Sequence, residues 1–140
     1  MRQRTLIIVK PDVMAAGAAS PLLAEIERAG LVLVARRTLR MQRQSVEALY
    51  AEHRGKDFFP RLVEFMSSGP CLVAVFEGEQ AVARARQLVG ATDPAQAAPE
   101  SIRARFGTDL PRNAVHASDS PTDAQREIAF FFDDPELLQQ

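Results

Sequence analysis

The chain has 140 residues, of which 46% are hydrophobic and 25% charged, a composition typical of a globular domain rather than a disordered segment. Its formal net charge of −1 argues against a general nucleic-acid-coating role, and no apolar run is long enough to cross a membrane. The single cysteine, Cys71, excludes an internal disulfide, and with only two histidines the chain has too few soft ligands for a structural zinc site. We therefore expect a cytoplasmic protein without a signal peptide, with one domain over residues 1–140.

Apolar spacing and turn residues divide the chain into strands and helices. A continuous apolar run at residues 4–9 predicts a buried strand, which Pro11 ends because proline lacks a backbone N–H. Ser20 and Pro21 predict the N-cap and first residue of a helix that runs to about Ala29. The later elements are predicted as a strand at 31–39, helices at 44–52 and 60–66, a strand at 71–76, a helix at 80–89, a short helix at 101–106, a strand at 114–117 and a helix opening at Ser120-Pro121.

The order of these elements predicts a βαββαβ arrangement, with an antiparallel sheet and helices on one face. Residues 91–113 are rich in loop-forming residues, and a loop of this length in a small domain is typically functional or mobile. The tail at about 133–140 is expected to fray. The chain contains no internal repeat and no linker.

The common glycine-rich phosphate motifs are missing. Gly55-Lys56 lacks the upstream glycine and the following Ser or Thr of a P-loop, and no G-x-G-x-x-G follows a strand. Fifteen of the 17 basic residues are arginines, whose planar guanidinium suits phosphate, although codon composition explains this bias as well. A nucleotide would therefore have to be bound by side chains.

His116 lies at the end of the predicted last strand, in Asn113-Ala114-Val115-His116-Ala117-Ser118-Asp119. One interpretation is a capped surface residue. The other is a nucleophile, because imidazole attacks phosphorus well and the P–N bond it forms can pass the group on. Glu127, one helix later, is placed to orient the ring, with Ser118 nearby.

Further motifs run through nearly the whole chain. They are Arg4-Thr5-Leu6 with Lys10-Pro11-Asp12, Tyr50-Ala51-Glu52-His53, Phe58-Phe59, Leu62 to Met66 with Ser68-Gly69-Pro70, Gly90-Ala91-Thr92-Asp93-Pro94, Ile102-Arg103, and Arg126-Glu127-Ile128-Ala129. Together with the His116 block, and in this order and spacing, they resemble the nucleoside diphosphate kinase family.

The resemblance implies a ferredoxin-like α/β fold, an α+β sandwich in which helices flank a four-stranded antiparallel sheet. It implies ping-pong transfer of a γ-phosphoryl group from a nucleoside triphosphate to a nucleoside diphosphate (ATP/ADP, GTP/GDP and others) through a phosphohistidine on His116. Mg²⁺ would sit on the nucleotide phosphates, without a metal site of the protein's own. The family forms homo-oligomers built from dimers, and a tetramer or a hexamer is expected.

The resemblance also assigns roles to individual residues. The catalytic set is His116 with Glu127, Ser118, Tyr50 and Lys10. The nucleotide-binding set is Lys10 and Asn113 at the ribose, with Lys10 also at the transferred phosphate, Arg86, Thr92, Arg103 and His53 at the phosphates, and Phe58 and Leu110 on the two faces of the base. Helical spacing turns Arg84 or Arg86, but not both, toward the cleft.

Structural interpretations stand beside these roles. Lys10 alone would be a solvated strand-end lysine, Tyr50 a packing residue and His53 an exposed helix-end residue. Ala117 and Ser20 stand where the family commonly has glycine, and the Cβ of Ala117 would reorient the imidazole if that position needs a positive φ.

Two other functions remain open. The domain could be a catalytically weak nucleotide-binding module with the same fold. It could also be a DNA-binding regulator, a role for which the charge balance gives no support. A solvated face explains the arginine cluster at least as well. That cluster comprises Arg36, Arg37, Arg40 and Arg43.

Overall fold

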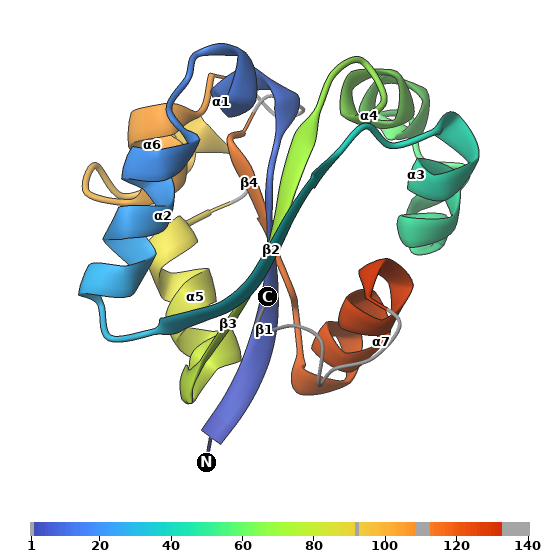
Figure 1. The fold of residues 1–140 in the computed structure, drawn as a ribbon. Helices are drawn as coiled ribbons and strands as arrows, with labels where there is room; N and C mark the ends of the chain where they lie inside the picture. The colour runs from blue at the N-terminus through green and yellow to red at the C-terminus, as the bar shows by residue number, and fades with distance from the viewer. Residues whose placement is uncertain (1, 92, 109–112, 133–140) are drawn as a thin grey trace.

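A single antiparallel sheet runs through the molecule. The computed structural model describes residues 2–91, 93–108 and 113–132 (Figure 1). The strands are β1 (Arg2–Val9), β2 (Val32–Leu39), β3 (Cys71–Glu79) and β4 (Val115–Ala117), in the spatial order β2-β3-β1-β4. Strand β1 pairs with both β3 and β4, and β2 pairs with β3. The predicted four-stranded antiparallel sheet and ferredoxin-like architecture are confirmed.

Helices cover both faces of this sheet (Figure 1). They are α1 (Pro11–Ala15), α2 (Ala19–Arg28), α3 (Arg43–Leu49), α4 (Phe59–Met66), α5 (Ala81–Val89), α6 (Ile102–Phe106) and α7 (Pro121–Phe131), with short 3-10 turns at Ala51–His53 and Pro94–Gln96. One core lies between the sheet and α2 and α5, and a second lies between the sheet and α3, α4 and α7.

The prediction of helices on one face is therefore wrong. The reason lies in β1, where Ile7 belongs to one core and its neighbours Leu6 and Ile8 to the other, and all three are fully buried. Successive side chains of a strand point to opposite faces, so a continuous apolar run is buried only when both faces are covered.

Helix ends agree with the sequence in part. Helix α7 begins as predicted, because the Ser120 hydroxyl accepts the N–H of Asp123 at 3.1 Å. The predicted cap at Ser20 is wrong, since α2 already begins at Ala19. Pro21 is tolerated in its first turn because the first N–H groups of a helix have no partner within it. Helix α1 was not predicted, although its first residue is Pro11.

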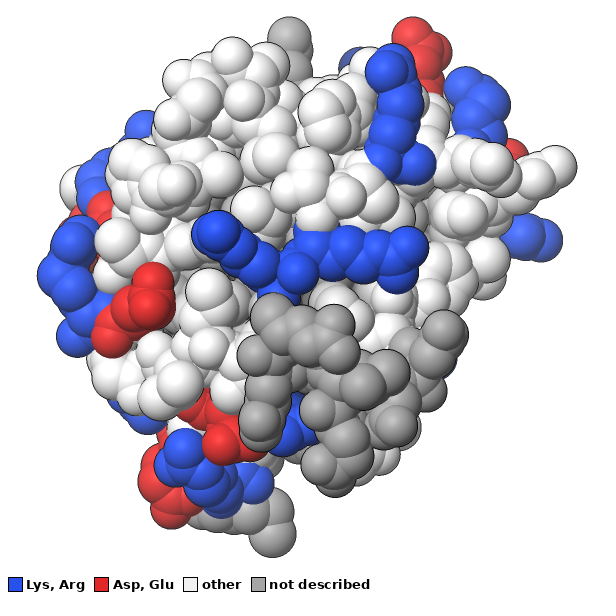
Figure 2. Space-filling model, viewed as in Figure 1, with Lys and Arg blue, Asp and Glu red and all other residues white. Residues whose placement is uncertain are grey.

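The face seen in Figure 2 carries basic side chains across its middle, in front of β2. Two arginines of the predicted cluster bind carbonyl groups of this chain, Arg37 that of Phe131 at 2.8 Å and Arg40 that of Ser68 at 3.0 Å. These bonds favour the interpretation of a structural, solvated face.

None of the helices in the described part of the chain is both long and apolar enough to span a membrane. The predicted frayed tail, 133–140, lies outside the described residues.

Candidate active site

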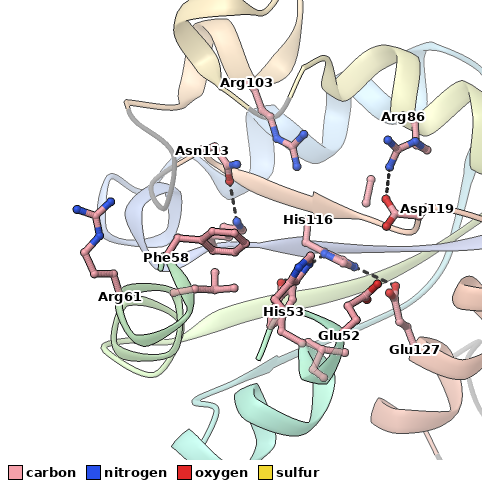
Figure 3. Close-up of a pocket in the computed structure, with 15 residues that line it drawn as sticks. Glu52, His53, Phe58, Arg61, Arg86, Arg103, Asn113, His116, Asp119 and Glu127 are labelled. Atoms are coloured by element: carbon pink, nitrogen blue, oxygen red, sulfur yellow. Dashed lines mark hydrogen bonds and ion pairs between the residues drawn. The ribbon is translucent and has the colours of Figure 1, made fainter. Parts of the chain in front are cut away.

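A cavity of about 380 Å³ opens where β4 meets the segments around α3, α4, α5, α6 and α7 (Figure 3). Most of the predicted site residues line it. They are Lys10, Tyr50, His53, Phe58, Arg86, Arg103, Asn113, His116 and Glu127. Segments far apart in the sequence thus bring a histidine, several cations and an aromatic ring to one hollow.

Strand β4 decides which way His116 points. Its neighbours Val115 and Ala117 are buried in the core that faces α2 and α5. Because side chains alternate along a strand, His116 points to the opposite face, toward α7 and Tyr50. Its backbone pairs with Ile8 of the strand β1, and this register fixes where along the sheet the imidazole lies.

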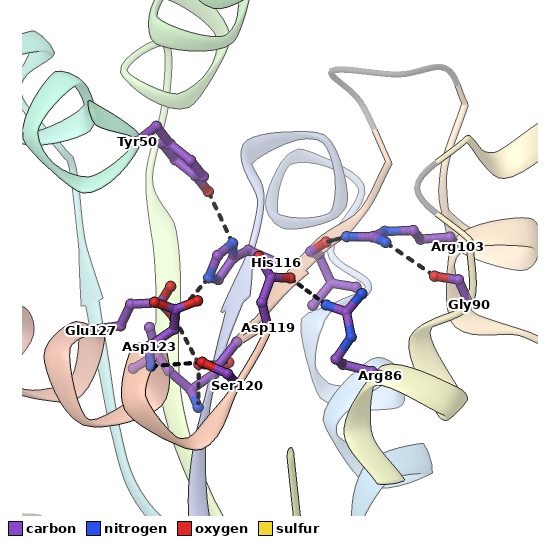
Figure 4. Close-up of polar contacts among 12 residues, drawn as sticks. Tyr50, Arg86, Gly90, Arg103, His116, Asp119, Ser120, Asp123 and Glu127 are labelled. Carbon is purple, nitrogen blue, oxygen red and sulfur yellow. Dashed lines mark hydrogen bonds and ion pairs between the residues drawn. The ribbon is translucent and has the colours of Figure 1, made fainter. Parts of the chain in front are cut away.

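Glu127 holds one nitrogen of this ring. Its Oε1 lies 2.9 Å from Nε2 of His116 (Figure 4). The same oxygen also accepts the Ser118 hydroxyl at 2.7 Å. Burial opposes ionisation of Glu127, but the contacts with His116 and Ser118 prevail and lower its pKa. An ionised carboxylate only accepts hydrogen bonds, so Nε2 carries the proton and Nδ1 presents a lone pair.

Ser118 connects this carboxylate to the centre of the sheet. The side chain of Ser118 is fully buried, and its oxygen accepts the N–H of Leu6 at 3.2 Å while its hydroxyl donates to Glu127. The Ser118 N–H donates in turn to the carbonyl of Leu6 at 3.2 Å. Ser118 therefore positions Glu127 and is itself shielded from the cavity.

Tyr50 stands at the other nitrogen. Its hydroxyl lies 3.3 Å from Nδ1 of His116, and the two rings meet edge to face (Figure 4). Burial raises the pKa of Tyr50, and the negative charge of Glu127 adds to this effect. Tyr50 is therefore a neutral donor to the Nδ1 lone pair rather than a base.

Three cations surround the open side of the histidine. Arg86 pairs with Asp119 at 2.5 Å, and Arg103 donates to the carbonyl of Gly90 at 3.1 Å (Figure 4). Arg103 also donates to the carbonyl of Val115 at 2.9 Å. Burial lowers the pKa of Arg103 to about 10, with the charge of Arg86 adding to the effect, so Arg103 keeps its charge at neutral pH.

Lys10 is the most deeply buried of these cations. Its Nζ donates to Oδ1 of Asn113 at 2.6 Å. Burial, together with the nearby charge of Arg103, lowers the pKa of Lys10 to about 7. The charge on Lys10 is therefore poised near neutral pH, and an anion in the cavity would stabilise it.

An aromatic wall closes the opposite end of the cavity. Phe58 is 41% exposed, and its ring centroid lies 5.4 Å from that of His53. His53 also lies 3.0 Å from Nζ of Lys56, at the exposed rim. The ring of Phe58 thus offers a face to a planar ligand in the cavity.

Two of the predicted nucleotide-binding residues, Thr92 and Leu110, lie outside the described residues. Ala117 is not among the described non-glycine residues with positive φ, so its Cβ is accommodated. Arg84 turns to the carbonyls of Glu79 and Ala29 while Arg86 lines the cavity, as helical spacing predicts. Lining residues that were not predicted are Leu49, Glu52, Arg61, Leu62, Ala117 and Asp119. Of these, Ala117 and Asp119 lie within the His116 block, and Glu52 and Leu62 lie within other motifs of the resemblance. Leu49 and Arg61 carry no sequence signal.

Fold and cavity together define an α/β domain of the ferredoxin-like class with a histidine set among cations. The family model for nucleoside diphosphate kinase matches residues 3–137. The chain is 48% identical over 136 residues to a nucleoside diphosphate kinase of Archaeoglobus fulgidus, covering 97% of this chain and 90% of the relative. It is 47% identical over 135 residues to that of Psychromonas ingrahamii, covering 96% and 94%.

Solved structures agree with this result. A nucleoside diphosphate kinase of Aquifex aeolicus superposes with a TM-score of 0.91 at 49% identity, covering 94% of this chain and 96% of the other. The halophilic enzyme of Halobacterium salinarum in complex with CDP superposes with a TM-score of 0.92 at 41% identity, covering 97% and 91%. The chain belongs to the nucleoside diphosphate kinase family, a family of phosphotransferases, and the family prediction made from the sequence is confirmed.

Proposed function

We propose that this chain transfers the γ-phosphoryl group of a nucleoside triphosphate to a nucleoside diphosphate in two half-reactions through His116. In the first, Nδ1 attacks the γ-phosphorus, the P–O bond to the β-phosphate breaks, and the diphosphate leaves. In the second, a terminal phosphate oxygen of another diphosphate attacks the phosphohistidine and the P–N bond breaks. The observation that carries the proposal is the contact of Nε2 with Glu127, because it leaves Nδ1 as the nitrogen with a lone pair.

Glu127 stabilises the ring once it is phosphorylated. Attack by Nδ1 places positive charge on the imidazole, and the carboxylate at Nε2 offsets that charge. Tyr50 moves its hydroxyl from Nδ1 to an oxygen of the incoming phosphoryl group, since Nδ1 no longer has a lone pair. The side chain of His116 is 14% exposed, so it is largely buried but still accessible from the cavity.

The surrounding cations supply the electrostatic part of catalysis. In a loose phosphoryl-transfer transition state, charge spreads over the non-bridging oxygens, and fixed cations stabilise it. Lys10, Arg86 and Arg103 all line the cavity that contains His116. Arg86 exchanges its partner Asp119 for phosphate when a nucleotide binds.

The divalent metal that the family uses is proposed to be Mg²⁺, held by the nucleotide phosphates. No group of three metal-ligating side chains occurs among the residues that the structure describes. The donor set fits Mg²⁺, which keeps several waters and prefers substrate phosphates with one or two carboxylates. Asp119, with a side chain 61% exposed at the cavity, would hold the hydrated ion, and the ion would supply charge neutralisation on the phosphates.

Phe58 is proposed to stack on the base and Asn113 to bind the ribose. Stacking needs only a π face, so it supports broad base specificity. A relative from Halobacterium salinarum has been solved with CDP, which supports a pyrimidine nucleotide as one of the ligands. His53 and the residues Thr92 and Leu110 keep their proposed nucleotide-binding roles.

We further propose that the protein is a cytoplasmic homo-oligomer, a tetramer or a hexamer. Strand β2 lies at the edge of the sheet, and Val32 in it is 52% exposed, which supports contact with another copy. The cytoplasmic location is supported by the lone cysteine, since disulfide-stabilised secreted domains carry pairs. Sedimentation at micromolar concentration tests the assembly, and a monomer there would contradict it.

The half-reactions can be tested separately. Mixing the protein with a γ-labelled triphosphate alone should release one diphosphate per active site, and a diphosphate added later should remove the label. His116→Gln should abolish both steps while nucleotide binding survives. Nucleotide binding without any release of diphosphate would contradict the proposal and indicate a binding module.

A further inference from the structure

Asp12 has no role in the chemistry described above, although it belongs to the Lys10-Pro11-Asp12 block. Its Oδ2 accepts the backbone N–H of Ala114 at 3.2 Å. The N–H of Lys10 donates to the carbonyl of Ala114 at 2.9 Å. Both backbone polar groups of Ala114 are therefore bound by one short segment at the end of β1.

Ala114 has an unfavourable backbone conformation. Its φ is +75°, and Gln80 is the other non-glycine residue with positive φ in the described part of the chain. The N–H of Val115 donates to the carbonyl of Asn113 at 2.9 Å, which closes a γ-turn around Ala114. A γ-turn with positive φ is strained for any residue that has a Cβ, so it persists only where its surroundings hold it.

This turn sets the start of β4 and therefore the site. Asn113, which enters the turn, binds Lys10 through its side chain. Two residues after Ala114 comes His116, paired with Ile8 of β1. If the turn relaxed, the side chains on its two sides would shift relative to each other.

We propose that Asp12 is a positioning residue that holds Ala114 in the γ-turn and thereby places His116 and Asn113 in one geometry. Its carboxylate is well suited to this task, because a hydrogen bond to an ionised acceptor is stronger than one to a neutral acceptor. The inference rests on the proposed function of His116 for its kinetic consequences. The alternative is that Asp12 only favours the first turn of α1, where an acidic residue is common.

Four proteins distinguish these interpretations: the wild type, Asp12→Ala, Ala114→Gly and the double variant. The readout is the single-turnover rate of His116 phosphorylation at saturating nucleotide. Asp12→Ala should lower this rate about 10- to 100-fold, because small misplacements of reacting groups are costly, and should change nucleotide affinity only a few-fold. The rate for Asp12→Asn should lie between those of the wild type and Asp12→Ala, since the amide oxygen still accepts the Ala114 N–H.

Ala114→Gly should restore most of the lost rate in the double variant, because glycine adopts positive φ without a steric cost. A role confined to α1 predicts no such rescue. Asp57→Asn, at an exposed carboxylate, is the matched control and should leave the rate unchanged. A folded double variant as slow as Asp12→Ala, or a wild-type rate in Asp12→Ala, would overturn the proposal.

Denaturant unfolding of the same four proteins tests whether Asp12 holds the γ-turn at Ala114, independently of the phosphorylation of His116. Asp12→Ala should lower the free energy of unfolding more in the wild-type background than in the Ala114→Gly background. Equal losses in the two backgrounds would overturn the inference. If the four unfolding free energies show this coupling but His116 of the wild type is never phosphorylated, the proposed function is refuted. The role of Asp12 in holding Ala114 would still stand.

Discussion

Nε2 of His116 and Oε1 of Glu127 lie 2.9 Å apart, with both side chains largely buried. This contact fixes the tautomer of the ring and turns the other nitrogen, Nδ1, toward Tyr50 and the cavity. The proposed chemistry depends on this one relationship, since a ring flipped about its axis would place Nδ1 at Glu127 and present Nε2 to the nucleotide instead.

Glu127→Gln should lower the rate of His116 phosphorylation about a hundredfold. The neutral amide no longer offsets the positive charge that develops on the ring, and it can donate as well as accept, so it fixes the tautomer less well. Rapid-quench measurement with labelled triphosphate gives the rate. Glu64→Gln, at an exposed glutamate of α4, is the matched control. Equal rates for the two variants would contradict the role of Glu127.

Phe58→Ala should raise the KM for nucleotides about 5- to 100-fold, as expected for the loss of one base–aromatic stack, with a smaller effect on kcat. Phe130 is a closely matched control, because both residues are 41% exposed and Phe130 does not line the cavity. Steady-state kinetics with a purine and a pyrimidine diphosphate measure both effects. A similar KM rise in Phe130→Ala would show that lost apolar surface, and not stacking, is responsible.

Arg86 and Arg84 lie on the same helix, and substituting each in turn distinguishes phosphate binding from structural support. Arg86→Gln should reduce kcat/KM about 10- to 1000-fold, because it removes a cation from the transferring phosphate. Arg84→Gln should leave kcat/KM close to the wild-type value and lower the melting temperature, since Arg84 binds the carbonyls of Glu79 and Ala29. The reverse pattern would contradict the assignment.

Lys10 should make nucleotide binding depend on pH. Its pKa of about 7 means that it is largely neutral in the free protein at about pH 8, where an unperturbed lysine is charged. A bound phosphate favours the charged form and raises this pKa, so binding takes up a proton, and affinity falls as the pH rises above 7.

Calorimetry in buffers of different ionisation enthalpy measures this proton uptake. At about pH 8 the nucleotide phosphates are fully ionised, so the uptake is assigned to the protein. Lys10→Met should remove most of it. Equal uptake by the wild type and Lys10→Met would show that another group is protonated.

Much of the fold could be predicted from local signals. Ser120-Pro121 marks the start of α7 because a cap and a proline at the first helical position act locally. The two-sided cover of the sheet could not be derived from helix periodicity, which gives the apolar side of a helix but not the face of the sheet it meets. The apolar run in β1 contained that information, since it is buried on both faces.

The site, like the fold, could be predicted only where local sequence signals decide. The His116 block and the cations can be recognised by residue type and spacing. The roles of Asp12 and Asp119 depend on contacts with Ala114 and Arg86, over 102 and 33 residues of sequence separation. A strained backbone such as that of Ala114 has no signature in residue type, because alanine rarely adopts positive φ.

The residue that carries the transferred phosphate, and the acid stability of its bond, decide whether transfer runs through His116. After incubation with γ-labelled triphosphate, we expect a label that acid removes and base preserves, that peptide mapping places on His116, and that His116→Gln lacks. An acid-stable label, or a label on any other residue, would contradict it.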